Sequence, residues 1–86
     1  MYKAIFSEII GTFFLISTIL VLKKPIFIIS VLLMAIYLFR NVSGAHFNPA
    51  VSFVMFMNNT IQIKTLIIYV LAQLTGAMLA LHTWKK

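Results

Sequence analysis

The sequence has almost no acid and no cysteine. Glu8 is the single acidic residue among 86, and seven lysines and arginines bring the formal net charge to +6. One carboxylate per chain excludes a carboxylate pair for acid–base catalysis or for binding Mg²⁺ or Ca²⁺. The absence of cysteine excludes disulfides, thiolate zinc sites and cysteine nucleophiles. We therefore predict that the chain is not an enzyme and that it binds no cofactor or metal.

Apolar residues are what the sequence has in excess. They make up 63% of the chain, the mean hydropathy is +1.09, and charged residues contribute only 9%. This composition is far more apolar than that of a soluble domain. The cations lie at the ends of apolar runs, so we interpret them as anchors at a membrane surface and expect no nucleic-acid partner. The sequence predicts a multi-pass integral membrane protein in a lipid bilayer and does not identify which membrane.

Three apolar runs predict membrane spans at residues 4–22, 25–41 and 62–83. Crossing a hydrocarbon core requires about 20 helical residues. The second run is short, but the cationic side chains at its ends can extend to the membrane surface. The basic and apolar start is similar to a signal peptide, yet Glu8 interrupts it and no small-x-small cleavage site follows. We expect an uncleaved span.

A loop and a short helix are expected between the second and third spans, at residues 43–57. Gly44 and Pro49 prevent the second helix from continuing, and Asn48-Pro49 is a typical helix start. A helix from there to Met57 has a length of about 15 Å, half of a hydrocarbon core about 30 Å thick. This indicates a re-entrant segment, buried by protein or lining a water-filled cavity. A surface amphipathic helix after an ordinary Asn-Pro turn is the alternative.

The residues around this turn resemble a known family. Ser43-Gly44-Ala45-His46-Phe47-Asn48-Pro49-Ala50-Val51-Ser52 is similar to the first Asn-Pro-Ala box of the aquaporins and glycerol facilitators, the major intrinsic proteins. Glu8-x-x-Gly11-Thr12 and Tyr69-x-x-Ala72-Gln73-x-x-Gly76-Ala77 resemble the motifs of that family's first and third helices. The resemblance covers almost the whole chain. It implies an all-α membrane protein with three transmembrane helices plus one re-entrant half-helix, forming one aquaporin-type repeat over residues 1–86.

One departure from the family pattern is decisive for the expected assembly. The family carries two inverted repeats, whereas these 86 residues contain one Asn-Pro-Ala box and no internal repeat. A half-helix that stops at the midplane leaves its positive N-terminal end unopposed. The resemblance implies that a second half-helix faces it and that the two Asn side chains offer N–H groups to a passing water or hydroxyl. We expect a passive channel for water and other small neutral solutes. Its pore would lie between two antiparallel copies, in a homodimer or a higher oligomer.

The distribution of cations bears on antiparallel assembly. Three predicted spans and a re-entrant loop put three cations on one membrane side, with the N-terminal amine, and four on the other. This near balance gives little orientation preference under the positive-inside rule, and we interpret it as dual topology. The first group is Lys3, Arg40 and Lys64, and the second is Lys23, Lys24, Lys85 and Lys86.

The resemblance also implies roles for individual residues. Asn48, Pro49 and Ala50 would form the pore turn, and the Glu8 carboxylate would accept hydrogen bonds from the backbone of the loop. A proton relay through Glu8 and His46 is the alternative. The remaining residues expected to brace the loop are Gln73, Ser43, Gly44 and His46.

The expected selectivity filter departs from the family. An antiparallel partner would put Ile28 of one chain against Ile36, Ala45 and Val51 of the other. Val51 stands where the family has an Arg directly after Asn-Pro-Ala. We therefore expect an uncharged constriction with weaker exclusion of protons and cations.

Two other functional classes remain open. The chain is interpreted either as a half-subunit that pairs with a separately encoded second repeat, or as a non-conducting remnant or small holin-like membrane protein. A strongly one-sided topology would favour the half-subunit.

Overall fold

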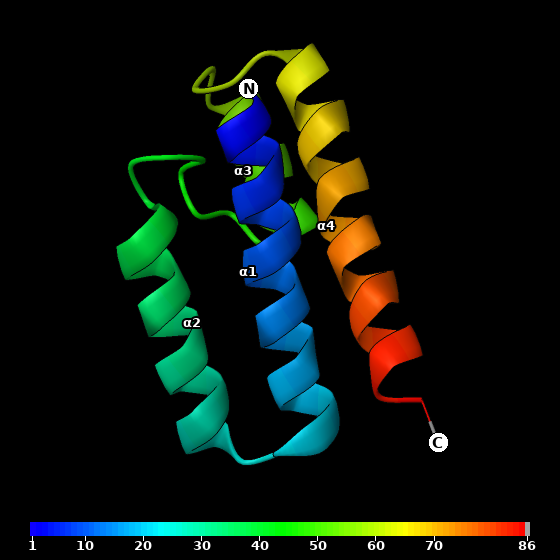
Figure 1. Ribbon diagram of the computed structural model, residues 1–86. Coiled ribbons are helices and arrows are strands. Elements are labelled where there is room, and N and C mark those ends of the chain that lie inside the picture. Colours follow the sequence, from blue (N-terminus) through cyan, green and yellow to red (C-terminus); the bar gives the residue numbers. More distant parts are fainter. Residues whose placement is uncertain (86) are drawn as a thin grey trace.

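The computed structural model describes residues 1–85, which fold into four helices and contain no strand. The helices are α1 (Tyr2–Val21), α2 (Pro25–Phe39), α3 (Pro49–Met57) and α4 (Ile63–Thr83) (Figure 1). Lys86, one of the expected surface anchors, lies outside the described residues.

The helices differ in length, which decides what each can span. The 20 residues of α1 and the 21 of α4 give lengths of about 30 Å, and both helices are apolar enough to cross a membrane. The 15 residues of α2 give only about 22 Å. This helix ends at Phe39, and the Phe39 carbonyl accepts the N–H groups of Val42 and Ser43 in a turn instead.

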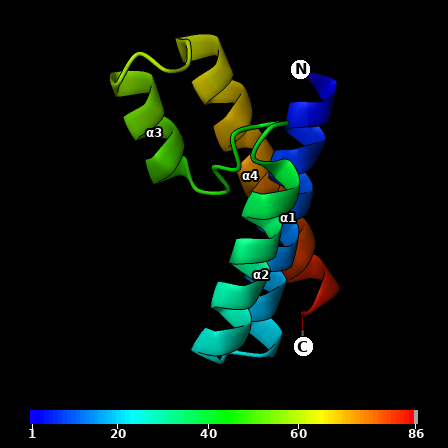
Figure 2. The ribbon, with the colours of Figure 1, turned by 90° about the vertical axis from the view of Figure 1, so that its left-hand side faces the viewer.

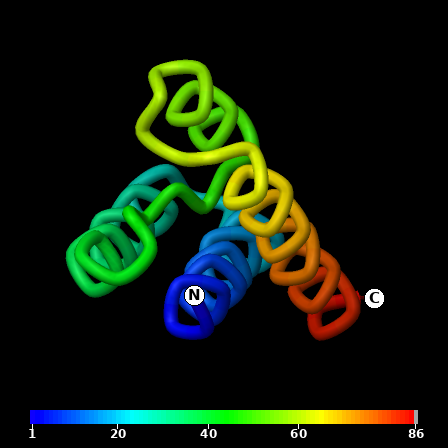
Figure 3. The backbone as a smooth tube through the Cα atoms, turned by 90° about the horizontal axis from the view of Figure 1, so that it is seen from above, coloured from blue at the N-terminus to red at the C-terminus, as the bar shows by residue number. Residues whose placement is uncertain are grey.

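Helix α1 lies between α2 and α4, and α3 packs against α4 (Figure 3). The α1–α4 contact is close because Gly76 has no side chain. A Cβ at Gly76 would overlap the backbone carbonyl of Ile9 and approach the Phe13 nitrogen at 3.1 Å. Among the described residues α2 contacts only α1 of the other helices, so α2 and α3 are left apart.

Helix α3 begins at half the height of its neighbours. The connection before it reaches Gly11, the tenth of the 20 residues of α1, where the ring of Phe47 occupies the space that a Cβ would take. From that level α3 runs back toward the end of the molecule where the N-terminus lies (Figure 2). The chain thus enters and leaves the α3 region at the same end.

The interior of this fold is more polar than its surface. The exposed faces carry large apolar residues such as Phe6, Leu33 and Val54. The buried apolar residues are few, and most of them are alanines. The buried polar side chains are Ser7, Glu8, Thr12, Ser17, Thr18, Ser43, His46, Ser52 and Gln73. This distribution suits a lipid environment, where apolar side chains gain nothing by leaving the surface.

Candidate functional site: the Asn-Pro-Ala turn and its polar cluster

The Asn-Pro-Ala turn forms the start of α3. Asn48 is the N-cap in an extended conformation (φ −159°, ψ 125°), and its Oδ1 accepts the N–H of Ala50 at 2.8 Å. Pro49 follows at the first helical position, where a missing N–H is tolerated. All three residues of the turn are exposed in the single chain. The Asn48 side chain therefore uses its oxygen for the cap and presents its amide N–H groups outward.

The connection before α3 has an unusual backbone. Gly44, Ala45 and Phe47 all have positive φ angles, of 90°, 55° and 53°. For a residue other than glycine this left-handed conformation costs about 1–2 kcal/mol. Two such residues within four positions require compensating contacts from the surrounding structure.

Glu8 supplies most of these contacts. Its Oε2 accepts hydrogen bonds from Ser43 Oγ at 2.6 Å and from the His46 N–H at 3.1 Å, and its Oε1 accepts the Phe47 N–H at 2.8 Å. A fourth donor, Gln73 Nε2, reaches Oε1 at 2.9 Å from the middle of α4. The side chain of Glu8 is 0% exposed. Burial of a carboxyl group is costly unless hydrogen bonds replace its water, and here four of them do.

Gln73 and Ser52 together connect this carboxyl group to the ring of His46. Gln73 Nε2 also donates to Ser52 Oγ at 2.9 Å, and the same oxygen lies 2.8 Å from His46 Nδ1. The hydroxyl of Tyr69 donates to the Ser43 carbonyl at 2.6 Å, and its ring packs edge-on against His46 with centroids 5.0 Å apart. We call the six residues joined in this way the polar cluster. They are Glu8, Ser43, His46, Ser52, Tyr69 and Gln73.

An aromatic contact fixes the end of the connection that lies next to α3. Phe47 is 3% exposed, and its ring lies against Gly11 of α1 and edge-on to Phe39 of α2, with centroids 6.2 Å apart. The ring thus joins α1 and α2 at the level where α3 begins. Because Gly11 has no Cβ, Phe47 can lie directly on the α1 backbone.

Three residues of this arrangement were not among the expected site residues, although the sequence carries signals for them. Ser52 lies four positions after Asn48, and Tyr69 lies four positions before Gln73, so each shares a helix face with an expected residue. The signal for Phe47 is indirect: a glycine inside a helix, such as Gly11, leaves room for a large side chain from another segment to lie on the helix backbone. Of the expected bracing residues, Glu8, Ser43, His46 and Gln73 are brought together, and Gly44 lies beside the His46 ring.

The four residues of the expected filter lie on three separate segments. Ile28 and Ile36 belong to α2, Ala45 to the connection before α3, and Val51 to α3. Ile28, Ala45 and Val51 are half-buried and Ile36 is 36% exposed. Since α2 and α3 make no contact, one chain does not close these residues into a ring.

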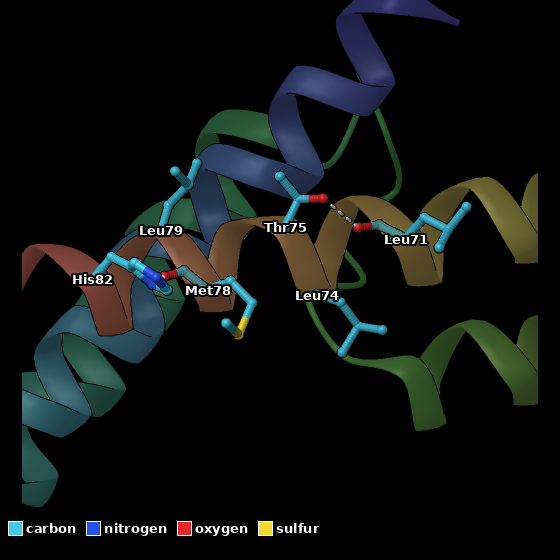
Figure 4. Close-up of a pocket in the computed structure, with 6 residues that line it drawn as sticks. All are labelled: Leu71, Leu74, Thr75, Met78, Leu79 and His82. Atoms are coloured by element: carbon cyan, nitrogen blue, oxygen red, sulfur yellow. Dashed lines mark hydrogen bonds between the residues drawn. The ribbon is translucent and has the colours of Figure 1, made fainter.

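Apolar hollows mark the outer surface. One of about 430 Å³ lies between α3 and α4 next to Pro49, and another of about 280 Å³ lies between α1 and α2 next to Gly11. A third, of about 420 Å³, runs along α4 (Figure 4). Its lining residues are Leu71, Leu74, Thr75, Met78, Leu79 and His82. Both of its polar side chains already have a backbone partner: Thr75 Oγ1 donates to the Leu71 carbonyl at 2.7 Å, and His82 Nδ1 lies 2.9 Å from the Met78 carbonyl. Residues 1–85 hold no group of three His, Cys, Asp or Glu that suits a metal ion.

Over residues 1–85 these features describe an all-helical protein with two helices long and apolar enough to cross a membrane, whose polar interior fixes a half-length helix. Comparison with known proteins gives the family. The family model for the major intrinsic protein matches residues 26–85. The chain belongs to the major intrinsic protein family, which is a family of integral membrane proteins, and it resembles aquaporins and glycerol facilitators.

Several relatives are similar to the chain over part of their length. The glycerol uptake facilitator protein-like 6 of Lactiplantibacillus plantarum is 34% identical over 83 residues, covering 86% of this chain and 38% of the relative. Aquaporin-B of Dictyostelium discoideum is 51% identical over 45 residues, covering 52% of this chain and 15% of the relative. The aquaglyceroporin of Toxoplasma gondii is 45% identical over 53 residues, covering 60% and 20%. No solved structure matches the chain significantly. The chain thus spans well under half the length of these relatives.

Proposed function

We propose that the chain is a passive membrane channel for water and other small neutral solutes, not an enzyme, and that two antiparallel copies form the pore where their Asn-Pro-Ala turns meet. Helices α1, α2 and α4 span the bilayer in this proposal, and residues 43–57 form the re-entrant segment. The observation that carries it is the position of Asn48, at the level of the middle of α1 and α4, with its amide N–H groups exposed.

The geometry of α3 supports the meeting of two turns. Its nine residues have a length of about 13 Å, and its N-terminal end carries the positive end of the helix dipole. Within a bilayer that end would lie near the midplane, where it has no counterpart in one chain. A second copy turned upside down supplies an identical half-helix, so two positive ends and two Asn amide groups face one another. This field disfavours cations and allows neutral hydrogen-bonding solutes.

The connection before α3 supplies the complementary acceptors. Within residues 1–85 the backbone carbonyls of Gly44, Ala45 and His46 accept no backbone hydrogen bond. The Glu8 carboxyl group holds the N–H groups of His46 and Phe47 on the protein side. In the proposed pore these free carbonyls form a row of acceptors along the solute path, and the polar cluster keeps the row in place.

The open side of α2 supports a second copy as the missing wall. Only Ala35 is buried on this helix, although its 15 residues are almost entirely apolar. Since α2 does not touch α3, one chain leaves the space between them unfilled by another helix. The near balance of cations at the two ends is compatible with insertion in both orientations.

The function is tested by stopped-flow light scattering of vesicles that contain only this chain. We expect osmotic shrinkage to be faster than in protein-free vesicles, with a low activation energy. Asn48→Leu, which removes the cap and the amide donors, should abolish the increase. Wild-type vesicles that shrink at the rate of protein-free ones would contradict the proposal.

The filter is tested separately with Val51→Arg. An uncharged ring formed by Ile28, Ile36, Ala45 and Val51 should let protons leak more than a ring that contains an arginine. Val51→Arg is therefore expected to lower both proton leak and water flux, whereas Val51→Leu, which changes size without charge, should leave the proton leak near the wild-type value. Unchanged water flux and proton leak in Val51→Arg would contradict the filter assignment.

The limited coverage of the relatives favours one second candidate. Because the chain spans 38% of the glycerol facilitator relative, a different segment that carries its own Asn-Pro-Ala box is an alternative partner. In that case vesicles with residues 1–86 alone would not conduct, and co-reconstitution with a second repeat of that kind would restore water flux.

A further inference from the structure

Cationic side chains lie at both ends of the molecule, and no exposed acidic side chain accompanies them. Every described lysine and arginine is exposed. The only acid, Glu8, is 0% exposed and its carboxyl group is occupied by four hydrogen bonds from the loop and α4. The surface described by residues 1–85 thus carries positive charge that no side chain of this chain can neutralise.

Each end carries three described cations, and at one end two of them are adjacent in the sequence. The α1–α2 turn and the final residues of α4 lie at the same end of the molecule in both side views (Figures 1 and 2). This end, which we call the turn end, carries Lys23 and Lys24 from the turn and Lys85 after α4. At the opposite end, Lys3 and Lys64 come from the starts of two different helices, and Arg40 follows α2.

The lysines of the turn end are held on ordered backbone. Lys23 has a φ of 61° and donates its N–H to the Thr18 carbonyl at 3.0 Å, which fixes the end of α1. Trp84 donates its indole N–H to Ser17 Oγ at 2.9 Å and is 46% exposed. This bond fastens the end of α4, and therefore the position next to Lys85, to α1. A half-exposed indole at a helix end is typical of the headgroup level of a bilayer.

From these observations we infer that the turn end is a docking surface for the headgroups of anionic phospholipids such as phosphatidylglycerol. The phosphate groups lie at the depth where Trp84 and the three lysines are held. Clustered basic residues next to a membrane-spanning helix attract anionic lipids, and each residue contributes about a fivefold gain in binding. The inference does not depend on channel activity, because its readout is lipid binding.

Native mass spectrometry tests the inference on the whole chain in detergent with equal amounts of phosphatidylglycerol and phosphatidylcholine. We expect the wild type to retain phosphatidylglycerol preferentially. The double variant Lys23→Gln/Lys24→Gln should lower this retention at least about fivefold, and Lys23→Arg/Lys24→Arg should preserve it. Raising the salt to 0.5 M should weaken the preference, because it shortens the range of charge interactions. Circular dichroism verifies that each variant keeps its helices.

Two control arms make the result specific. Lys3→Gln/Lys64→Gln removes two charges from the opposite end and should lower retention less than the change at the turn end. Inorganic phosphate alone should not displace the bound lipid. The inference is overturned by equal retention of the two lipids in the wild type, by an unchanged preference in Lys23→Gln/Lys24→Gln, or by full displacement with inorganic phosphate.

Discussion

Helix α1 has two very different neighbours. Toward α4 its backbone is in direct contact with Gly76, Ser17 binds the indole of Trp84, and the Glu8 carboxyl group reaches Gln73. Toward α2 it borders an apolar hollow of about 280 Å³, and Ala35 is the only buried residue on the α2 side. The first interface is complete within one chain, while the second leaves most of α2 available to another surface. The comparison leads us to treat α1, α4 and the loop as one closely packed unit, which we call the rigid frame. It agrees with the proposal that a second copy packs against α2.

The largest effect is expected where the rigid frame holds the loop. Glu8→Ala removes the acceptor of four buried hydrogen bonds and leaves their donors unsatisfied. We expect the free energy of unfolding to fall by about 3–6 kcal/mol, measured by circular dichroism during titration with sodium dodecyl sulfate. Ile10→Ala, on the same helix at a 39% exposed position, is the matched control and should change it far less. A loss below about 1 kcal/mol in Glu8→Ala would mean that the polar cluster does not hold the loop.

A smaller effect should separate the two sides of α1. Gly76→Ala places a methyl group against the Ile9 carbonyl and should reduce stability by about 1–3 kcal/mol, because neither backbone can move freely. Leu33→Ala, on α2 at a 66% exposed position, should change it by less than about 0.5 kcal/mol. The same unfolding titration compares them. Equal losses in the two variants would remove the distinction between a tight and an open interface.

The smallest predicted effect concerns a buried hydroxyl group without a hydrogen-bond partner inside the rigid frame. Thr12 is 4% exposed and its hydroxyl oxygen has no hydrogen-bond partner among residues 1–85. Thr12→Val keeps the shape and removes the unsatisfied group, so the stability should stay the same or rise by up to about 1 kcal/mol. Thr18→Val provides the contrast, because the Thr18 hydroxyl donates to the Phe14 carbonyl at 2.8 Å. If Thr12→Val destabilised the protein by more than Thr18→Val, the Thr12 hydroxyl would have to have a partner.

Much of this arrangement is accessible from the sequence because it depends on local rules. Long apolar runs predict α1 and α4, and Asn48-Pro49 predicts the start of α3 through its cap and its proline. The family resemblance implied that the Glu8 carboxylate accepts hydrogen bonds from the backbone of the loop. The three residues that were missed act across the fold. Ser52 accepts the hydrogen bond of Gln73, and Tyr69 meets His46, only after α4 has packed against α3 and the connection before it. Phe47 depends on a left-handed backbone. Nothing in the local sequence specifies that φ angle, since the contacts of Glu8 and Gly11 stabilise it from a distance.

The residues of the expected filter likewise divide into a part that the local sequence predicts and a part that depends on distant contacts. Ile28 and Ile36 share α2, but their relation to Ala45 and Val51 depends on a surface that one chain does not provide. The assignment of these four residues to a filter stays a prediction from the family resemblance, and in the proposed pore the geometry of the filter depends on the second copy. The arrangement of the two copies is therefore the central claim of the account.

Distance measurement between spin labels tests this claim most directly, and the absence of native cysteine makes single labelled sites clean. Labels at Lys3→Cys and Lys24→Cys mark the two ends of α1, which are about 30 Å apart. In bilayers, an upside-down pair predicts that chains labelled at residue 3 give a short distance to chains labelled at residue 24 and a distance of at least about 30 Å to one another. Short distances between two labels at residue 3, with long ones between residues 3 and 24, would mean that the copies point the same way and that the proposed pore does not exist.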